Sequence, residues 1–144
     1  MKFVVDVISD VICPWCYIGK RRLEKAIATH GEPVNVRWHP FQLNPAMPKE
    51  GISRKEYRTR KFGSWERSLE LDAKVIAVGE SEGIHFAFDR MERTPNTVDA
   101  HRLIWLVIVW FIIGTVWRTS FAWSVTSAAM IICCSLATAC AFPH

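Results

Sequence analysis

The charged residues of this 144-residue chain stop abruptly, and that break limits the possible folds more than the length does. Of the 18 Lys and Arg and the 14 Asp and Glu residues, only Arg118 follows Arg102. Residues 1–102 mix both charge signs, as a globular surface does. Residues 103–144 contain 30 apolar residues in 42 and cannot form such a surface. We therefore expect one globular domain followed by a segment of a different kind.

The overall composition narrows the class of protein. The net charge of +4 comes from interspersed charges without interleaved aromatic residues, so we expect no nucleic-acid partner. The basic clusters at residues 20–22 and 54–61 are interpreted as polar helix faces. Asp6 interrupts the first apolar run before it reaches the length of a signal peptide. We therefore expect a cytoplasmic chain, in which a cysteine pair is catalytic or metal-binding rather than structural.

The first 48 residues predict the order strand, helix, strand. Residues 2–8 are rich in Val and Ile, as a short buried strand is. Residues 17–30 carry apolar positions at helical spacing, and Gly31 follows where a helix C-cap glycine is expected. Residues 34–41 alternate between apolar and polar types, which indicates a second strand. This order predicts a βαβ unit with a parallel pair of strands.

The next residues, 49–104, predict a helical insertion. Ser53–Glu56 matches a capping box, which would begin a helix at Arg54 that Gly63 interrupts. A second helix is expected from Trp65 to Gly83, and a third near residue 97 with Asn96 or Thr97 as its N-cap. The face of the second helix that we expect to be buried is Trp65, Leu69, Ala73, Ile76 and Ala77.

The sequence Cys13-Pro14-Trp15-Cys16 lies where the first strand gives way to the first helix. Free N–H groups and the helix dipole at that position favour a negative charge, so we expect a lowered pKa for Cys13 and assign it the attacking thiol. Cys16, one turn further, would resolve a mixed disulfide. Pro14 suits the first helical turn, where its missing N–H costs little. Trp15 either shapes a substrate surface or serves packing.

Metal binding and other kinds of catalysis have little support in the sequence. A zinc site would need Cys133, Cys134 or Cys140, but two of these are adjacent instead of spaced by two residues. No phosphate loop, paired carboxylates or Ser-His-Asp order is present. We therefore expect no metal and no cofactor beyond a redox-active Cys13–Cys16 disulfide. The histidines are scattered along the sequence, and we interpret them as exposed or hydrogen-bonded, not catalytic. They are His30, His39, His85 and His101.

The segment from Ser9 to Lys20 resembles the active-site segment of DsbA-like thioredoxin proteins. It is similar to the intracellular branch that includes FrnE-type oxidoreductases and the 2-hydroxychromene-2-carboxylate isomerases. The resemblance spans about residues 3–104. Its further matches, in chain order, are Phe41–Pro45, Met47-Pro48 with Gly51, Lys61–Gly63, Asn96-Thr97 and Ala100–Leu103.

The resemblance implies an α/β, thioredoxin-like fold with a helical domain inserted after the second strand. It implies a thiol–disulfide oxidoreductase with Cys13 as nucleophile and Cys16 as resolving thiol. The substrate would be a protein or small-molecule thiol or disulfide. The isomerase branch, which resembles kappa-class glutathione transferases, usually has Ser at the position of Cys13. Two cysteines therefore favour redox chemistry, and a glutathione-dependent isomerase or transferase is the alternative.

The family pattern is not recognisable after Trp105. In the family, the rest of the sheet, a cis-proline loop facing the cysteines and a closing helix come next, whereas the late proline here is Pro143. We therefore expect an incomplete thioredoxin-like fold and a truncated, weakly active enzyme.

The apolar tail, residues 105–144, has three possible explanations. The run from Leu103 to Pro143 could be a membrane-inserted helix or hairpin, although it lacks the flanking basic residues that set topology. It could instead be a buried core element, or a frameshifted or fused reading frame in place of the true second half. The corresponding alternative function is a membrane-associated or non-catalytic remnant.

Overall fold

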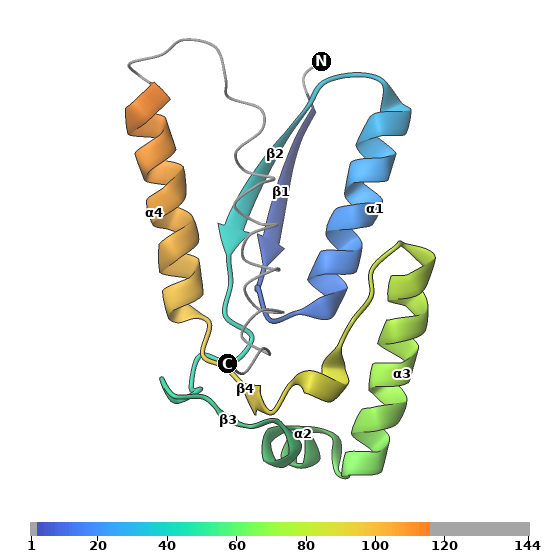
Figure 1. Ribbon diagram of the computed structural model, residues 1–144. Coiled ribbons are helices and arrows are strands. Elements are labelled where there is room, and N and C mark those ends of the chain that lie inside the picture. Colours follow the sequence, from blue (N-terminus) through green and yellow to red (C-terminus); the bar gives the residue numbers. More distant parts are fainter. Residues whose placement is uncertain (1–2, 116–144) are drawn as a thin grey trace.

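The computed structural model of the chain describes residues 3–115. Its first elements are β1 (Phe3–Ser9), α1 (Pro14–His30) and β2 (Val34–Pro40), and β1 pairs with β2 in parallel along its full length. The apolar run of β1 and the alternation of β2 thus produce the predicted βαβ unit. The expectation that β1 is buried is wrong, because Phe3, Val4 and Ile8 are 54%, 49% and 68% exposed. Figure 1 shows the two strands side by side, with α1 next to them.

Local chemistry determines both ends of α1. Cys13 is the N-cap, with extended backbone angles of φ −89° and ψ 109°, and Pro14 occupies the first turn. Gly31 follows the helix in the left-handed region at φ 75°, which a residue without a Cβ adopts without strain. The predicted helix start and glycine stop are therefore confirmed.

The chain between β2 and the last helix forms a predominantly helical segment that a short strand pair closes. β3 and β4 are antiparallel, with Ile52 opposite Thr94. Gly51, at φ 73°, precedes β3, and a Cβ there would lie 2.5 Å from the Thr94 carbonyl oxygen. Only glycine therefore allows this approach. The elements are β3 (Ile52–Ser53), α2 (Arg54–Phe62), α3 (Trp65–Ser81), the 3₁₀ turn η1 (Phe88–Arg90), β4 (Arg93–Thr94) and α4 (Val98–Thr115).

The helix starts are satisfied differently from what the sequence predicted. α2 does begin at Arg54, but the Ser53 side chain makes no capping hydrogen bond, so the predicted capping box is wrong. At α3, Ser64 Oγ accepts the N–H of Arg67 at 3.0 Å instead. At α4, the Thr97 carbonyl accepts the first helical N–H, that of His101, at 3.0 Å, so Thr97 occupies the N-cap position. The side chain of Asn96, one residue earlier, accepts the N–H of Val98 at 2.8 Å.

The predicted buried face of α3 is also wrong. Leu69, which was expected inside, is 48% exposed. Asp72 turns inward because two guanidinium groups of α2 reach it: Arg54 and Arg58 each donate to its carboxylate at 2.6 Å. The basic cluster of α2 is therefore partly internal, not a fully solvated face. The face that is buried is Ser68, Asp72, Val75 and Gly79.

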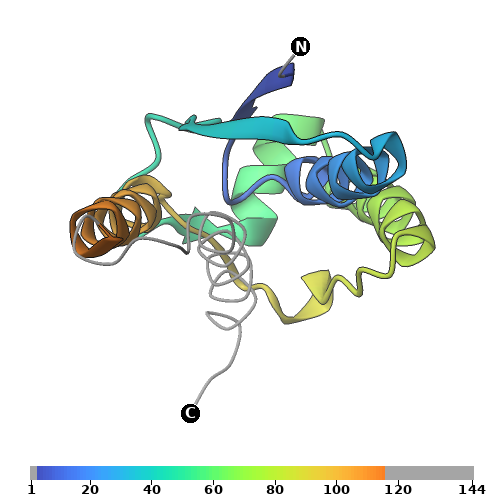
Figure 2. The same cartoon turned by 90° about the horizontal axis from the view of Figure 1, so that it is seen from above.

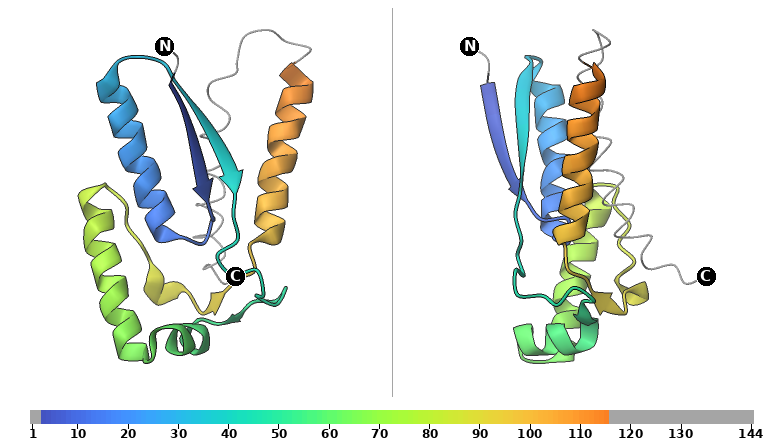
Figure 3. Two further views of the ribbon diagram at one scale, coloured as in Figure 1. Left: turned by 180° about the vertical axis from the view of Figure 1, so that it is seen from behind. Right: turned by 90° about the vertical axis from the view of Figure 1, so that its left-hand side faces the viewer.

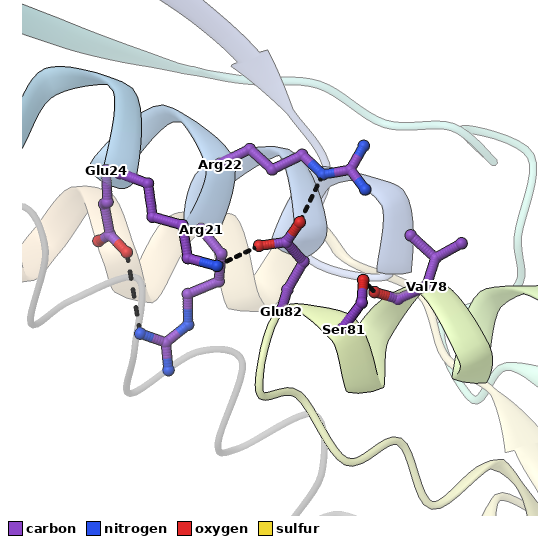
Figure 4. Close-up of polar contacts among 7 residues, drawn as sticks. Arg21, Arg22, Glu24, Val78, Ser81 and Glu82 are labelled. Atoms are coloured by element: carbon purple, nitrogen blue, oxygen red, sulfur yellow. Dashed lines mark hydrogen bonds and ion pairs between the residues drawn. The ribbon is translucent and has the colours of Figure 1, made fainter. Parts of the chain in front are cut away.

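The basic cluster of α1 is also not fully exposed. Lys20 is buried and forms an ion pair with Glu24, whereas Arg21 and Arg22 are exposed. Glu82, just after α3, accepts from Arg22 Nε at 2.8 Å and from Lys25 Nζ at 2.6 Å. Figure 4 shows this carboxylate between the two helices. The polar face of α1 thus makes ion pairs with the residue that follows α3.

The buried apolar core lies between α1 and α3, not over the strands. Ile18 of α1 and Val75 of α3 contact Ile84, and four partly buried side chains pack around them. We call α2, α3, residues 84–88 and the α1 face against them the helical side. The four surrounding side chains are Tyr17, Val78, Phe86 and Phe88.

The remaining elements, β1, β2 and α4, form what we call the strand side. α4 lies on the opposite flank of the strands from α1, and the side view places both helices on one face of the strand pair (Figures 2 and 3). Large apolar side chains remain exposed here, including Ile8 at 68% and Trp105 at 64%.

The apolar tail begins inside α4, which continues as one helix through the change of composition at Leu103. None of the helices in residues 3–115 combines the length and apolarity that crossing a membrane requires. The rest of the predicted tail, from residue 116 on, lies outside the described residues.

Candidate active site

The motif cysteines occupy the junction between β1 and α1. The N–H of Cys13 donates to the Asp10 carbonyl at 3.1 Å, which closes a tight turn between the strand and the helix. The N–H groups of Cys16 and Tyr17 donate to the Cys13 carbonyl, at 3.1 and 3.3 Å, and start α1. Both thiols are free and half-buried. The strand-to-helix position expected for a thiol pair is therefore present.

The electrostatics of Cys13 differ from the sequence expectation. Burial and a side-chain hydrogen bond with Cys16 raise the pKa of Cys13 from 9.0 to about 11. Hydrogen bonds from the backbone of Cys16 and Trp15 lower it, as a helix N-terminus should, but they are outweighed. The expected lowering of the Cys13 pKa is thus wrong for this structure, because desolvation dominates.

The two residues between the cysteines are placed as their types suggest. Pro14 lies in the first turn of α1, where it removes no helical hydrogen bond. Trp15 follows with 51% of its surface exposed. Its indole ring therefore forms part of the surface next to the thiols. The zinc alternative involves Cys133, Cys134 and Cys140, which lie outside the described residues.

Asp10 is a functional neighbour that the sequence analysis did not single out. Its side chain is completely buried, and the carboxylate accepts the N–H of Leu43 at 2.7 Å. The other carboxylate oxygen lies 3.1 Å from His101 Nε2 and 3.5 Å from the N–H of Ile12. One carboxylate therefore connects the strand end, the cysteine turn, the loop after β2 and α4.

His101 is hydrogen-bonded, as the sequence analysis proposed for the histidines. Its Nε2 lies 3.1 Å from Asp10 Oδ1 and 3.0 Å from the Phe41 carbonyl oxygen. Both of these atoms are acceptors, so Nε2 carries the proton. His39 is likewise paired, with Asp6 at 2.7 Å on the exposed face of the strands.

Several of the segments on which the family resemblance rests, namely those after β2 and at the start of α4, contact one another. Asn96 Nδ2 donates to the Met47 carbonyl at 2.6 Å, and Tyr57 hydrogen-bonds Asn44. The Asn96 and His101 contacts attach the loop after β2 to the start of α4, and the Tyr57 contact attaches the same loop to α2. The order of these residues in the sequence does not predict their contacts, because the contacts join segments that are far apart along the chain.

A shallow, open depression lies beside His101. Its walls are largely apolar, with Phe41 and Trp105 among them. Gln42 also lines it, and its Nε2 is buried without a hydrogen-bond partner among the described residues. The depression therefore offers a mainly apolar surface, and the buried Gln42 Nε2 is not accessible from it.

Comparison with known proteins agrees with this arrangement. A family model described as the DSBA-like thioredoxin domain matches residues 4–108. The uncharacterized protein YwbO of Bacillus subtilis is 32% identical over 78 residues, which are 54% of this chain and 37% of that protein. A crystal structure of a probable DsbA oxidoreductase from Streptomyces coelicolor is similar with a TM-score of 0.66 and 33% identity, covering 75% of this chain and 47% of that one. The chain spans less than half the length of either relative.

Proposed function

Because the chain belongs to the DSBA-like thioredoxin domain family, we propose that it carries out thiol–disulfide exchange at Cys13 and Cys16. The observation that carries the proposal is the position of Cys13. It is the N-cap of α1, at the end of the short turn that follows β1 of a parallel βαβ unit, and Cys16 lies one turn further along the helix. Family membership supports oxidoreductase chemistry in general, and the assignment to these two thiols is ours.

The exchange proceeds through a mixed disulfide. The Cys13 thiolate attacks one sulfur of a substrate disulfide, and the other sulfur leaves as a thiolate. The Cys16 thiolate then attacks the Cys13 sulfur, forming the Cys13–Cys16 disulfide and releasing the substrate as a dithiol. Two electrons pass from the pair to the substrate, and the protons lost by the pair are taken up by the released thiolates. The reverse sequence oxidises a substrate dithiol.

The raised pKa predicts slow exchange at neutral pH. Raising the pKa from 9.0 to about 11 reduces the thiolate fraction of Cys13 about 100-fold. A more basic thiolate is intrinsically more nucleophilic, which recovers about tenfold. We therefore propose that Cys13 reacts about tenfold more slowly at pH 7 than an ordinary thiol, and that turnover by this chain is weak.

The substrate class follows from what surrounds the thiols. The half-exposed indole of Trp15, which lies between the two cysteines in the sequence, supports a substrate whose thiol or disulfide is flanked by apolar groups. The glutathione-dependent isomerase alternative has less support, because that branch usually has Ser at the position of Cys13.

Trapping of the mixed disulfide tests the proposal. All variants carry serine at Cys133, Cys134 and Cys140, so that only the motif thiols react. With a peptide disulfide, Cys16→Ser should accumulate one covalent adduct at Cys13, and the matched Cys13→Ser variant should accumulate none within the same time. Equal adduct formation by the two variants would refute the assignment of Cys13 as nucleophile.

An insulin-reduction assay tests the weak turnover separately. We expect a rate at least about tenfold below that of a complete thioredoxin-fold enzyme at pH 7, for the pKa reason given above. A comparable rate would contradict the weak activity while leaving the nucleophile assignment intact.

A further inference from the structure

The buried Asp10 carboxylate depends on its hydrogen-bond partners. A buried carboxylate is costly unless hydrogen bonds or opposite charges compensate the lost hydration. Two backbone N–H groups, of Leu43 and Ile12, provide part of this. Among residues 3–115, the side chain that hydrogen-bonds the carboxylate is that of His101. His101 therefore completes the environment that keeps Asp10 inside.

Asp10 in turn determines where Cys13 lies. Its carbonyl oxygen accepts the N–H of Cys13 at 3.1 Å, so the three-residue turn into α1 is anchored on Asp10. The neighbouring Ser9 carbonyl accepts the N–H of Phe41 at 3.0 Å, which fixes the same strand end to the loop after β2. A shift of the Asp10 side chain would therefore displace the N-cap of α1.

His101 contacts both Asp10 and the loop after β2. Its Nε2–H is shared between Asp10 Oδ1 and the Phe41 carbonyl, and its side chain is 12% exposed. It comes from α4, 91 residues after Asp10 in the sequence. Through this one N–H group, His101 connects α4 both to the turn that leads to the thiols and to the loop after β2.

We infer that His101 is a positioning residue for the thiol pair: through Asp10 it holds the turn that brings Cys13 and Cys16 together for disulfide closure. The inference rests on the proposed function. It does not make His101 a catalytic residue, because the atom it contacts is a carboxylate oxygen, not a reacting sulfur. Its effect is on the effective concentration of one thiol at the other.

The test compares the equilibrium constant of the Cys13–Cys16 disulfide with glutathione at pH 7, in the full chain with serine at the three tail cysteines. His101→Ala should lower this constant about tenfold, since the turn loses its anchor. His101→Gln retains an N–H donor and should restore the constant to within about threefold of the parent. His85→Ala, which alters an exposed histidine, should leave it unchanged.

A general loss of stability must be separated from loss of positioning. Val75→Ala weakens the core between α1 and α3 without touching the Asp10 contacts, so it should lower stability and leave the disulfide constant within about twofold. If His101→Ala does not fold, Asp10→Asn replaces it as the variant expected to lower the constant about tenfold. An unchanged constant in the folded variant, or an equal change in Val75→Ala, would overturn the inference. A parent chain that forms no Cys13–Cys16 disulfide would instead overturn the proposed function.

Discussion

The helical side and the strand side differ in how far they bury their apolar residues. On the helical side Ile18 is 1% exposed and Ile84 is 4% exposed. On the strand side Ile8 is 68% exposed and Trp110 of α4 is 75% exposed. Strand pairing and helix formation satisfy backbone groups locally, whereas burial needs a second packed layer. The stability of the described residues therefore comes mainly from the helical side, and the thiol pair lies at the boundary between the two.

The largest effect is expected at the buried ion pairs of the helical side. Asp72→Asn leaves the guanidinium groups of Arg54 and Arg58 without their carboxylate, and breaking such a buried pair costs about 3–5 kcal/mol. Asp99→Asn on the strand side removes an exposed pair with Arg102 and should cost at most about 1 kcal/mol. Urea denaturation of both variants measures the difference, and similar losses would contradict the comparison.

Two isoleucines give a matched test of burial. Ile18→Ala should reduce the free energy of unfolding by about 2–5 kcal/mol, because it opens a cavity between α1 and α3. Ile8→Ala removes the same atoms from an exposed position and should cost less than about 1 kcal/mol. Thermal or urea unfolding followed by circular dichroism would detect this. A larger loss for Ile8→Ala would show that the strand face is covered in solution.

Two left-handed glycines give a smaller test. Gly31→Ala introduces only backbone strain, about 1–2 kcal/mol, since a Cβ there meets nothing within 4 Å. Gly51→Ala adds a collision with the Thr94 carbonyl and should destabilise more, by separating β3 from β4. Midpoints of urea denaturation rank the two variants. Equal midpoints would mean that the Gly51 approach contributes nothing.

The smallest effect is expected at the exposed seam between α1 and α3. Hydrogen bonds from Lys25 and Arg22 lower the pKa of Glu82 below its ordinary value of 4.5. The charged form is favoured by folding, so this contribution is complete above pH 4.5 and is lost as the pH falls through the lowered pKa. Glu82→Gln should therefore reduce stability slightly at pH 7 and flatten its acid dependence. An unchanged pH dependence would argue against this linkage.

The sequence predicts those helices and strands whose ends depend on residues close by in the chain. The β1–α1–β2 order and the end of α2 follow from residue alternation, helical spacing and glycine stops. The buried face of α3 was predicted wrongly because it was chosen from the spacing of apolar residues alone, and the observed face contains Asp72. Its partners Arg54 and Arg58 belong to another helix, and sequence periodicity contains no information on that pairing.

In the candidate site, too, local sequence patterns predicted some features, whereas others depend on contacts between distant residues. The spacing and context of Cys13 and Cys16 identified the thiols, but not the burial that raises the pKa of Cys13. Asp10 and His101 lie 91 positions apart, and no local pattern links them. Their contact depends on how α4 packs against the strand ends, which only the folded chain determines.

The central claim is that Cys13 and Cys16 form one reversible redox pair. The most direct measurement equilibrates the full chain, with serine at the three tail cysteines, across glutathione buffers of increasing oxidising strength, then alkylates the free thiols and maps them by mass. The two cysteines should lose alkylation together, with one midpoint and the slope of a two-electron couple. Separate midpoints, with glutathione attached to each cysteine, or no reversible loss of alkylation at any ratio, would contradict the claim.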